Sequence, residues 1–177
     1  KELPSIALPL TLGGLIMPVS QLIDSALVLN LVKAGDATTL YGIWSGPVHS
    51  LLGMPVVLVG GVAAAVLPAI SRAHVSGNKP LMDANINSAL KLTNVIALPC
   101  VLGFACLSRQ IVRLLYSSLP ETDLRLAGSL LALSSASILF LALSGTCTSI
   151  MQGTGKIYYP LMFLGISCIV KIALNLI

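Results

Sequence analysis

The chain has 177 residues, of which 56% are hydrophobic and only 9% are charged, and its mean hydropathy is +0.97. A soluble domain carries about 25% charged residues, so this composition excludes an ordinary soluble domain and indicates a membrane protein. The net charge of +4 is distributed over loops and aromatic residues make up only 5% of the chain, so no basic and aromatic surface for nucleic acid is predicted.

Long stretches without charge predict five transmembrane helices in one all-α bundle over residues 1–177. A helix needs about 20 apolar residues to cross a bilayer. Transmembrane strands would be ~10-residue segments of alternating hydrophobicity, which these uniform runs exclude. The predicted helices cover approximately residues 5–31, 40–69, 84–107, 126–151 and 158–177. Because the chain begins without Met and ends inside the last helix, we expect it to be a piece of a longer protein.

The first predicted helix contains a single charged side chain, Asp24, in the thirty residues between Glu2 and Lys33. A carboxylate inside a membrane is costly unless it has a partner, a water-filled cavity or an ion, so it marks a functional site by default. At 100° per residue, Gln21 falls on the same face of the helix. We therefore predict that Asp24 and Gln21 face a polar interior.

The second predicted helix carries Ser45 and His49 on or beside a face that is rich in glycine. The glycines on this face are Gly42, Gly46, Gly53 and Gly60. Ser45 and His49 are candidates for a cavity or substrate site. Close packing of helices through small residues, with a packed histidine among them, is the alternative interpretation.

The third predicted helix is preceded by a polar segment, residues 79–91, which predicts a helix start that runs into the span. After the span, residues 109–117 place Arg109 and Arg113 on one face and apolar side chains on another. This spacing predicts a short separate helix that lies at the membrane interface.

The fifth predicted helix places Ser167, Lys171 and Asn175 at strict i, i+4 spacing. Lys171 either pairs with Asp24 across a cavity or extends its long side chain to the interface. Alternatively, Asp24 and Asn175 gather with backbone carbonyls around a hard cation such as sodium, which prefers oxygen ligands. The sequence leaves open whether Asp24 serves an ion pair, a proton site or a sodium site.

The distribution of Lys and Arg gives a weak preference for orientation. Five of them lie near helix ends on the side of the N-terminus and four on the other side, which favours a cytoplasmic N-terminus. The sequence offers no Walker A loop, GxSxG or HExxH motif, and its two histidines lie in different segments. We therefore predict a protein that is not an enzyme.

Four stretches, in matching order and spacing, resemble the second half of SpoVB-like proteins in the multidrug/oligosaccharidyl-lipid/polysaccharide exporter superfamily, which includes the MurJ-type lipid II flippases. These stretches are ALPLTLGGLIMP at 7–18 with LID at 22–24, VAAAVLPAISRAH at 62–74 with GN at 77–78, IMQGTGKIYYP at 150–160, and IVKIALN at 169–175.

The resemblance implies a transporter of about twelve to fourteen helices in two lobes, with this chain as helices seven to eleven. It implies that an undecaprenyl-pyrophosphate-linked sugar precursor is moved across the bacterial cytoplasmic membrane by alternating access. The implied partners are this lipid, the bilayer and the first lobe of the same protein. A multidrug or organic cation antiporter of the same superfamily and a non-transporting membrane scaffold are the alternatives.

The resemblance also bears on single residues. By position, Asp24 and Asn175 match the carboxylate and the amide of a sodium site that MurJ-type members can carry, so sodium or a proton is the implied coupling ion. MurJ-type flippases place an arginine for the pyrophosphate in the second helix of this lobe. Here Ser45 and His49 occupy that face instead, which favours a sporulation-type branch or another lipid-linked polymer.

Overall fold

The computed structural model describes residues 18–26, 37–156 and 158–175, and these residues form helices joined by short turns, with no strand among them. Three of the described helices are long and apolar enough to cross a membrane, by length and composition: Thr38–Val75, Lys79–Leu115 and Ala136–Gly153. The prediction of an all-α membrane bundle is therefore confirmed. Of the first predicted helix, only residues 18–26 are described, and they are helical.

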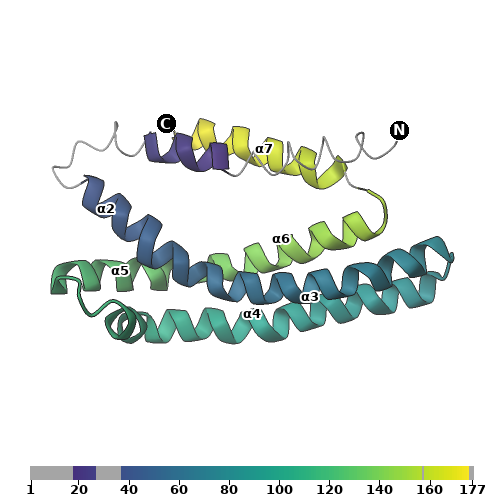
Figure 1. Ribbon diagram of the computed structural model, residues 1–177, viewed down its shortest axis with the longest axis horizontal. Helices are drawn as coiled ribbons and strands as arrows, with labels where there is room; N and C mark the ends of the chain where they lie inside the picture. The colour runs from purple at the N-terminus through teal and green to yellow at the C-terminus, as the bar shows by residue number, and fades with distance from the viewer. Residues whose placement is uncertain (1–17, 27–36, 157, 176–177) are drawn as a thin grey trace. The chain divides into compact units, whose positions relative to one another are not determined.

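Contacts divide the chain into two compact units, and the single bundle over residues 1–177 stays a prediction. The first unit consists of Lys1–Tyr41 with Lys156–Ile177, and the second of Gly42–Gly155. In the first unit, the helical segment 18–26 lies beside α7 (Tyr158–Asn175), as Figure 1 shows. Helix α2 (Ala37–Ile43) runs from the first unit into the second.

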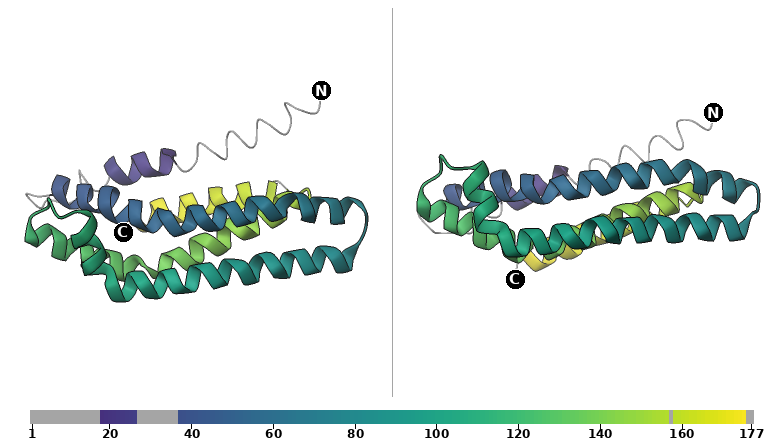
Figure 2. Two further views of the ribbon diagram at one scale, coloured as in Figure 1. Left: turned by 60° about the horizontal axis from the view of Figure 1, so that its bottom comes forward. Right: turned by 90° about the horizontal axis from the view of Figure 1, so that it is seen from below.

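The second unit is built around a long antiparallel pair of helices, α3 (His49–Val75) and α4 (Lys79–Leu115). Helix α6 (Ala136–Gly153) packs against both, and α5 (Glu121–Ser134) packs mainly against α4, as the views in Figure 2 show. A π-helical turn, η1 (Trp44–Val48), contains Pro47 and joins α2 to α3. Proline removes one backbone hydrogen bond, which accounts for the widened turn.

A tight turn joins α3 to α4. The N–H of Asn78 donates to the Ala73 carbonyl and that of Gly77 to the His74 carbonyl, both at 3.1 Å, which is the Schellman pattern of a helix end. Gly77 has a φ of +68°, a conformation that favours glycine. Asn78 Oδ1 then accepts the N–H of Leu81 at 3.1 Å and caps the start of α4.

Helix α4 is longer than a membrane is thick. Along its path, its 37 residues rise about 56 Å, against about 30 Å for the hydrocarbon core. The uncharged stretch 92–108 would fill about 26 Å of that core, so residues 79–91 extend beyond it. Residues 109–115 belong to the same helix, so the predicted short helix at 109–117 is not a separate element, but the end of α4 turns away from its long axis (Figures 1 and 2), and its position at the membrane interface stays a prediction. The segment contains no glycine or proline that would interrupt α4 before Tyr116.

The fourth predicted helix, 126–151, corresponds to two helices that meet at Ser135. The hydroxyl of Ser135 donates to the Ala132 carbonyl at 2.7 Å, and that of Ser137 donates to the Ser134 carbonyl at 2.6 Å. Serine hydroxyls that bond back to the preceding turn compete with the backbone ladder and bend helices. This is the physical reason for the break between α5 and α6.

Two apolar clusters hold the second unit together. One joins Leu51, Val112, Leu131 and Ile138 with their neighbours, and the other joins Val59, Ala97 and Ala142. Next to the second cluster, the buried hydroxyls of Thr93 and Thr146 are 2.7 Å apart, which links α4 to α6. Thr146 also donates to the Ala142 carbonyl at 3.0 Å. Because its single proton is used there, Thr93 is the donor to Thr146.

This assignment predicts unequal effects of two similar substitutions. Thr93→Val removes a donor and should cost about 0.6 kcal/mol, the average for such bonds between membrane helices. Thr146→Val leaves the buried Thr93 hydroxyl without its acceptor and should cost about 1–3 kcal/mol. Unfolding of the full-length protein in detergent would measure both, with exposed Thr122→Val as the control. Equal losses would show that Thr93 is not the donor.

Candidate functional site

An ion pair between Asp24 and Lys171 forms the candidate site. The Lys171 Nζ atom contacts Asp24 Oδ2, and it also donates to the Ser20 hydroxyl at 3.2 Å. All three residues belong to the first unit: Ser20 and Asp24 lie on the helical segment 18–26 and Lys171 lies on α7. One ammonium group therefore joins two polar groups on a neighbouring helical segment.

Helical spacing explains how Lys171 reaches both partners. Ser20 and Asp24 are four residues apart and share one face of their helical segment. The side chain of Asp24 is 23% exposed, that of Lys171 is 47% exposed, and Ser20 is 7% exposed. Opposite charges attract more strongly where water is scarce, so pairing lowers the cost of keeping both charges within an apolar stretch of chain.

Ser20 is a participant that the sequence prediction missed. Its signal was present, because it precedes Asp24 by one helical turn. A serine in an apolar helix also suits helix packing, and its position alone does not distinguish a partner for an ammonium group from a packing contact.

Two other predicted site residues, Gln21 and Asn175, also lie in the first unit. Gln21 is exposed on the segment 18–26, and among the described residues it takes no part in the contact between Asp24 and Lys171. Asn175 is the last residue of α7, one turn after Lys171. Its side chain lies outside the described part of the structure, so the predicted sodium ligands, Asp24 and Asn175, remain a prediction.

Ser45 and His49 lie in the second unit, one turn apart on η1 and at the start of α3, and both are exposed. Beside them, a Cβ atom added at Gly42, Gly46 or Gly53 would meet no described atom within 4 Å. Within the described residues, this glycine-rich face is therefore open rather than packed.

A shallow hollow of about 430 Å³ lies along α7, lined by Ile166, Ser167, Val170, Lys171 and Leu174. Lys171 therefore borders both the Asp24 carboxylate and an open surface. An anion at this surface would compete with Asp24 for the same ammonium group. The arrangement can exchange one negative partner of Lys171 for another without leaving the lysine unpaired.

Three helices that are long and apolar enough to cross a membrane define a multi-pass membrane protein, and an oppositely charged pair joins two further helical segments. The family follows from comparison with known sequences: residues 1–177 match the profile described as lipid II flippase MurJ. The chain belongs to this family, which confirms the resemblance to MurJ-type proteins that four sequence stretches indicated.

Two proteins of Bacillus subtilis (strain 168) are similar to the chain. One is described as "Lipid II flippase MurJ" and is 29% identical over 181 residues, which cover 98% of this chain and 32% of that protein. The other, "Uncharacterized membrane protein YabM", is 27% identical over 179 residues, covering 99% of this chain and 32% of that protein. The chain thus spans about a third of the length of these relatives. No solved structure matches it significantly.

Proposed function

We propose that the chain forms part of a flippase, not an enzyme, that moves a lipid-linked sugar precursor across the bacterial cytoplasmic membrane by alternating access. Membership of the MurJ family supports the class of transported molecule. The observation that carries the mechanism is the contact of Lys171 with Asp24 beside an open hollow on α7.

In this mechanism the pair works as an exchange switch. While Lys171 is bound to Asp24, the two charges cancel. When the pyrophosphate of an undecaprenyl-linked precursor reaches Lys171, the ammonium group transfers to the phosphate oxygens, which are strong acceptors for charged donors. The Asp24 carboxylate is then released and takes up a cation. Binding of the anionic substrate and binding of the coupling cation are thereby linked, and each favours the other.

The coupling cation is a proton or sodium. Sodium would use the carboxylate oxygens of Asp24 and an amide oxygen, for which Asn175 is the candidate. With the lipid-linked sugar bound, so that Lys171 has left Asp24, thermal stability of the full-length protein should then rise in sodium but not in potassium, because a ligand that binds only the folded state stabilises it. At a sodium concentration 100 times the dissociation constant, the gain is about 2.7 kcal/mol. This rise should disappear in Asp24→Asn. Equal stability in both salts would leave a proton as the coupling cation.

The substrate follows from the charges of the site. Residues 37–71 contain no arginine, so we assign the pyrophosphate to Lys171 of the first unit. The absence of an arginine from residues 37–71 favours a sporulation-type precursor or another lipid-linked polymer precursor over lipid II itself. The chain's N-terminus then lies in the cytoplasm, and the rest of the transporter supplies the first lobe.

Transport by the full-length protein in proteoliposomes tests the proposal. A fluorescent undecaprenyl-pyrophosphate sugar should cross the bilayer, and Asp24→Asn should block it. Movement of an organic cation in place of the lipid would instead establish the antiporter of the same superfamily. A protein that moves neither, and whose Asp24→Asn variant supports normal growth and sporulation, would be a scaffold.

A further inference from the structure

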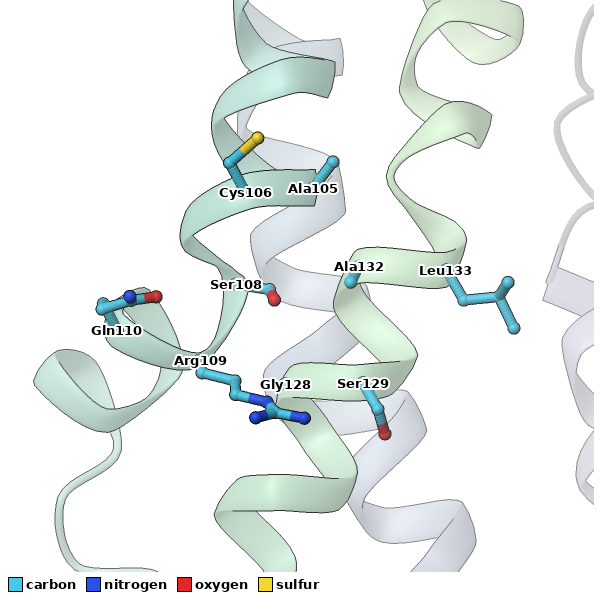
Figure 3. A pocket seen from close by; sticks show the side chains of 9 residues that line it. All are labelled: Ala105, Cys106, Ser108, Arg109, Gln110, Gly128, Ser129, Ala132 and Leu133. Carbon is cyan, nitrogen blue, oxygen red and sulfur yellow. The ribbon is translucent and has the colours of Figure 1, made fainter.

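Another hollow lies in the second unit, between α4 and α5. Its lining residues fall between positions 105 and 133. Its volume is about 640 Å³. Figure 3 shows Arg109, on α4, and Ser129, on α5, toward one end of the hollow, with Ala105 and Cys106 toward the other. The hollow thus joins a polar end that contains a cation to an end with little polarity.

Gly128 fixes the position of Arg109. A Cβ atom on Gly128 would lie 2.9 Å from Arg109 Cγ and 3.2 Å from Arg109 Cα, so only glycine lets α4 approach α5 this closely. The Arg109 side chain passes over α5 at Gly128 and brings its guanidinium group toward the side of the helix that carries Ser129 (Figure 3). A cation is therefore held in a defined place at the helix crossing.

This crossing lies where both helices change from apolar to charged. On α4, Arg109 directly follows the uncharged stretch 92–108. On α5, the charged residues Glu121, Asp123 and Arg125 precede an uncharged stretch that begins at Leu126. A boundary of this kind on two neighbouring helices marks the edge of the hydrocarbon core, which is the depth of the phospholipid phosphates.

The neighbouring charges leave Arg109 available. Arg113, one turn later on α4, forms a salt bridge with Glu121 at 3.0 Å. Among the described residues, no carboxylate forms such a bridge with Arg109. Arg125 lies one turn before Ser129 on the same face of α5 and adds a second positive charge.

We propose that this hollow binds the phosphate group of an anionic membrane phospholipid. The guanidinium group of Arg109 offers two parallel N–H donors to phosphate oxygens. The Ser129 hydroxyl donates to the Leu126 carbonyl at 2.8 Å, so it supplies no donor to the phosphate. Leu133, which is 82% exposed, provides an apolar surface for an acyl chain. Basic pockets between transmembrane helices bind acidic headgroups in this way. Neither Asp24 nor Lys171 lines this hollow.

Native mass spectrometry of the full-length protein with added phosphatidylglycerol tests the proposal. Arg109→Gln should weaken binding about tenfold, since the charge-assisted hydrogen bonds of its guanidinium group to the phosphate contribute at least on that order. Arg113→Gln is the matched control, because Arg113 carries the same charge on the same helix and is engaged by Glu121; its binding should not change. An equal loss in both variants would mean that only surface charge attracts the lipid, and would overturn the site.

Three further arms identify the ligand and guard against misfolding. Phosphatidylcholine at the same concentration should bind at least about fivefold more weakly, and equal binding would overturn the preference for an anionic lipid. Inorganic phosphate should not displace phosphatidylglycerol, and displacement would assign the site to free phosphate. Ser129→Phe fills the hollow from an exposed position and retains both arginines. It should abolish bound lipid if the hollow is the site, and unchanged binding would contradict the proposal.

Discussion

Full-length transporter with Lys171→Met should move a lipid-linked precursor about 100-fold more slowly than the unaltered protein. Methionine retains an unbranched apolar side chain but removes the ammonium group, so Asp24 loses its positive partner and the pyrophosphate loses its donor. A hydrogen bond to a charged group contributes about 1.5–3 kcal/mol, and the loss of about 2.7 kcal/mol from the barrier to transport corresponds to 100-fold in rate. Proteoliposomes with a fluorescent undecaprenyl-pyrophosphate sugar would measure the rate.

Lys91→Met provides the matched control for this experiment. Lys91 is an exposed lysine on α4 in the second unit, and it directly precedes the uncharged stretch 92–108. Its replacement removes the same charge without touching Asp24, and transport should change by less than about twofold, as is usual for surface substitutions. A Lys171→Met protein that is folded and transports at the normal rate would exclude the exchange switch.

The sequence was most informative where charge is scarce. Asp24 and Lys171 are each the single charged residue of a long apolar run. Because such charges are costly in a membrane, the sequence alone marks both residues as candidates. The structure brings the two into contact. Uniform apolar runs also predicted an all-α membrane bundle, because their length is set by the thickness of the bilayer.

Hydropathy was less informative about features that are decided by individual backbone contacts. The break at Ser135 depends on serine hydroxyls that bond to Ala132 and Ser134, and an apolar run looks the same with or without them. The continuation of α4 through Arg109 and Arg113 was hidden because the change from apolar to charged residues resembles a helix end. The chain has no glycine or proline at that point to end the helix.

The candidate sites show a similar limit. Ser20 is one turn from Asp24 and could have been found by spacing, but its partner Lys171 lies 151 residues away, and such a distant contact has no local signal. Arg109 was recognised only as part of an amphipathic face. Its significance comes from Gly128 on another helix, which allows the close approach that positions the guanidinium group.

Swapping the charges of Asp24 and Lys171 by mutation distinguishes a purely structural ion pair from the proposed exchange switch. Asp24→Lys alone places two ammonium groups together, and Lys171→Glu alone places two carboxylates together. Breaking a buried ion pair typically costs 3–5 kcal/mol, and with Lys171 half exposed we expect about 2 kcal/mol for each single variant. The double variant restores opposite charges and should recover most of that stability, as unfolding of the full-length protein in detergent would show.

Transport by the same double variant decides what the pair does. If Lys171 must transfer to the pyrophosphate beside the hollow on α7, a glutamate at that position repels the substrate, and transport should stay about 100-fold below normal although stability returns. If transport recovers together with stability, the pair only ties the segment 18–26 to α7. If stability does not recover, the coupling between the two side chains is not an ion pair. Only the first result agrees with a lysine that carries the substrate's counter-charge.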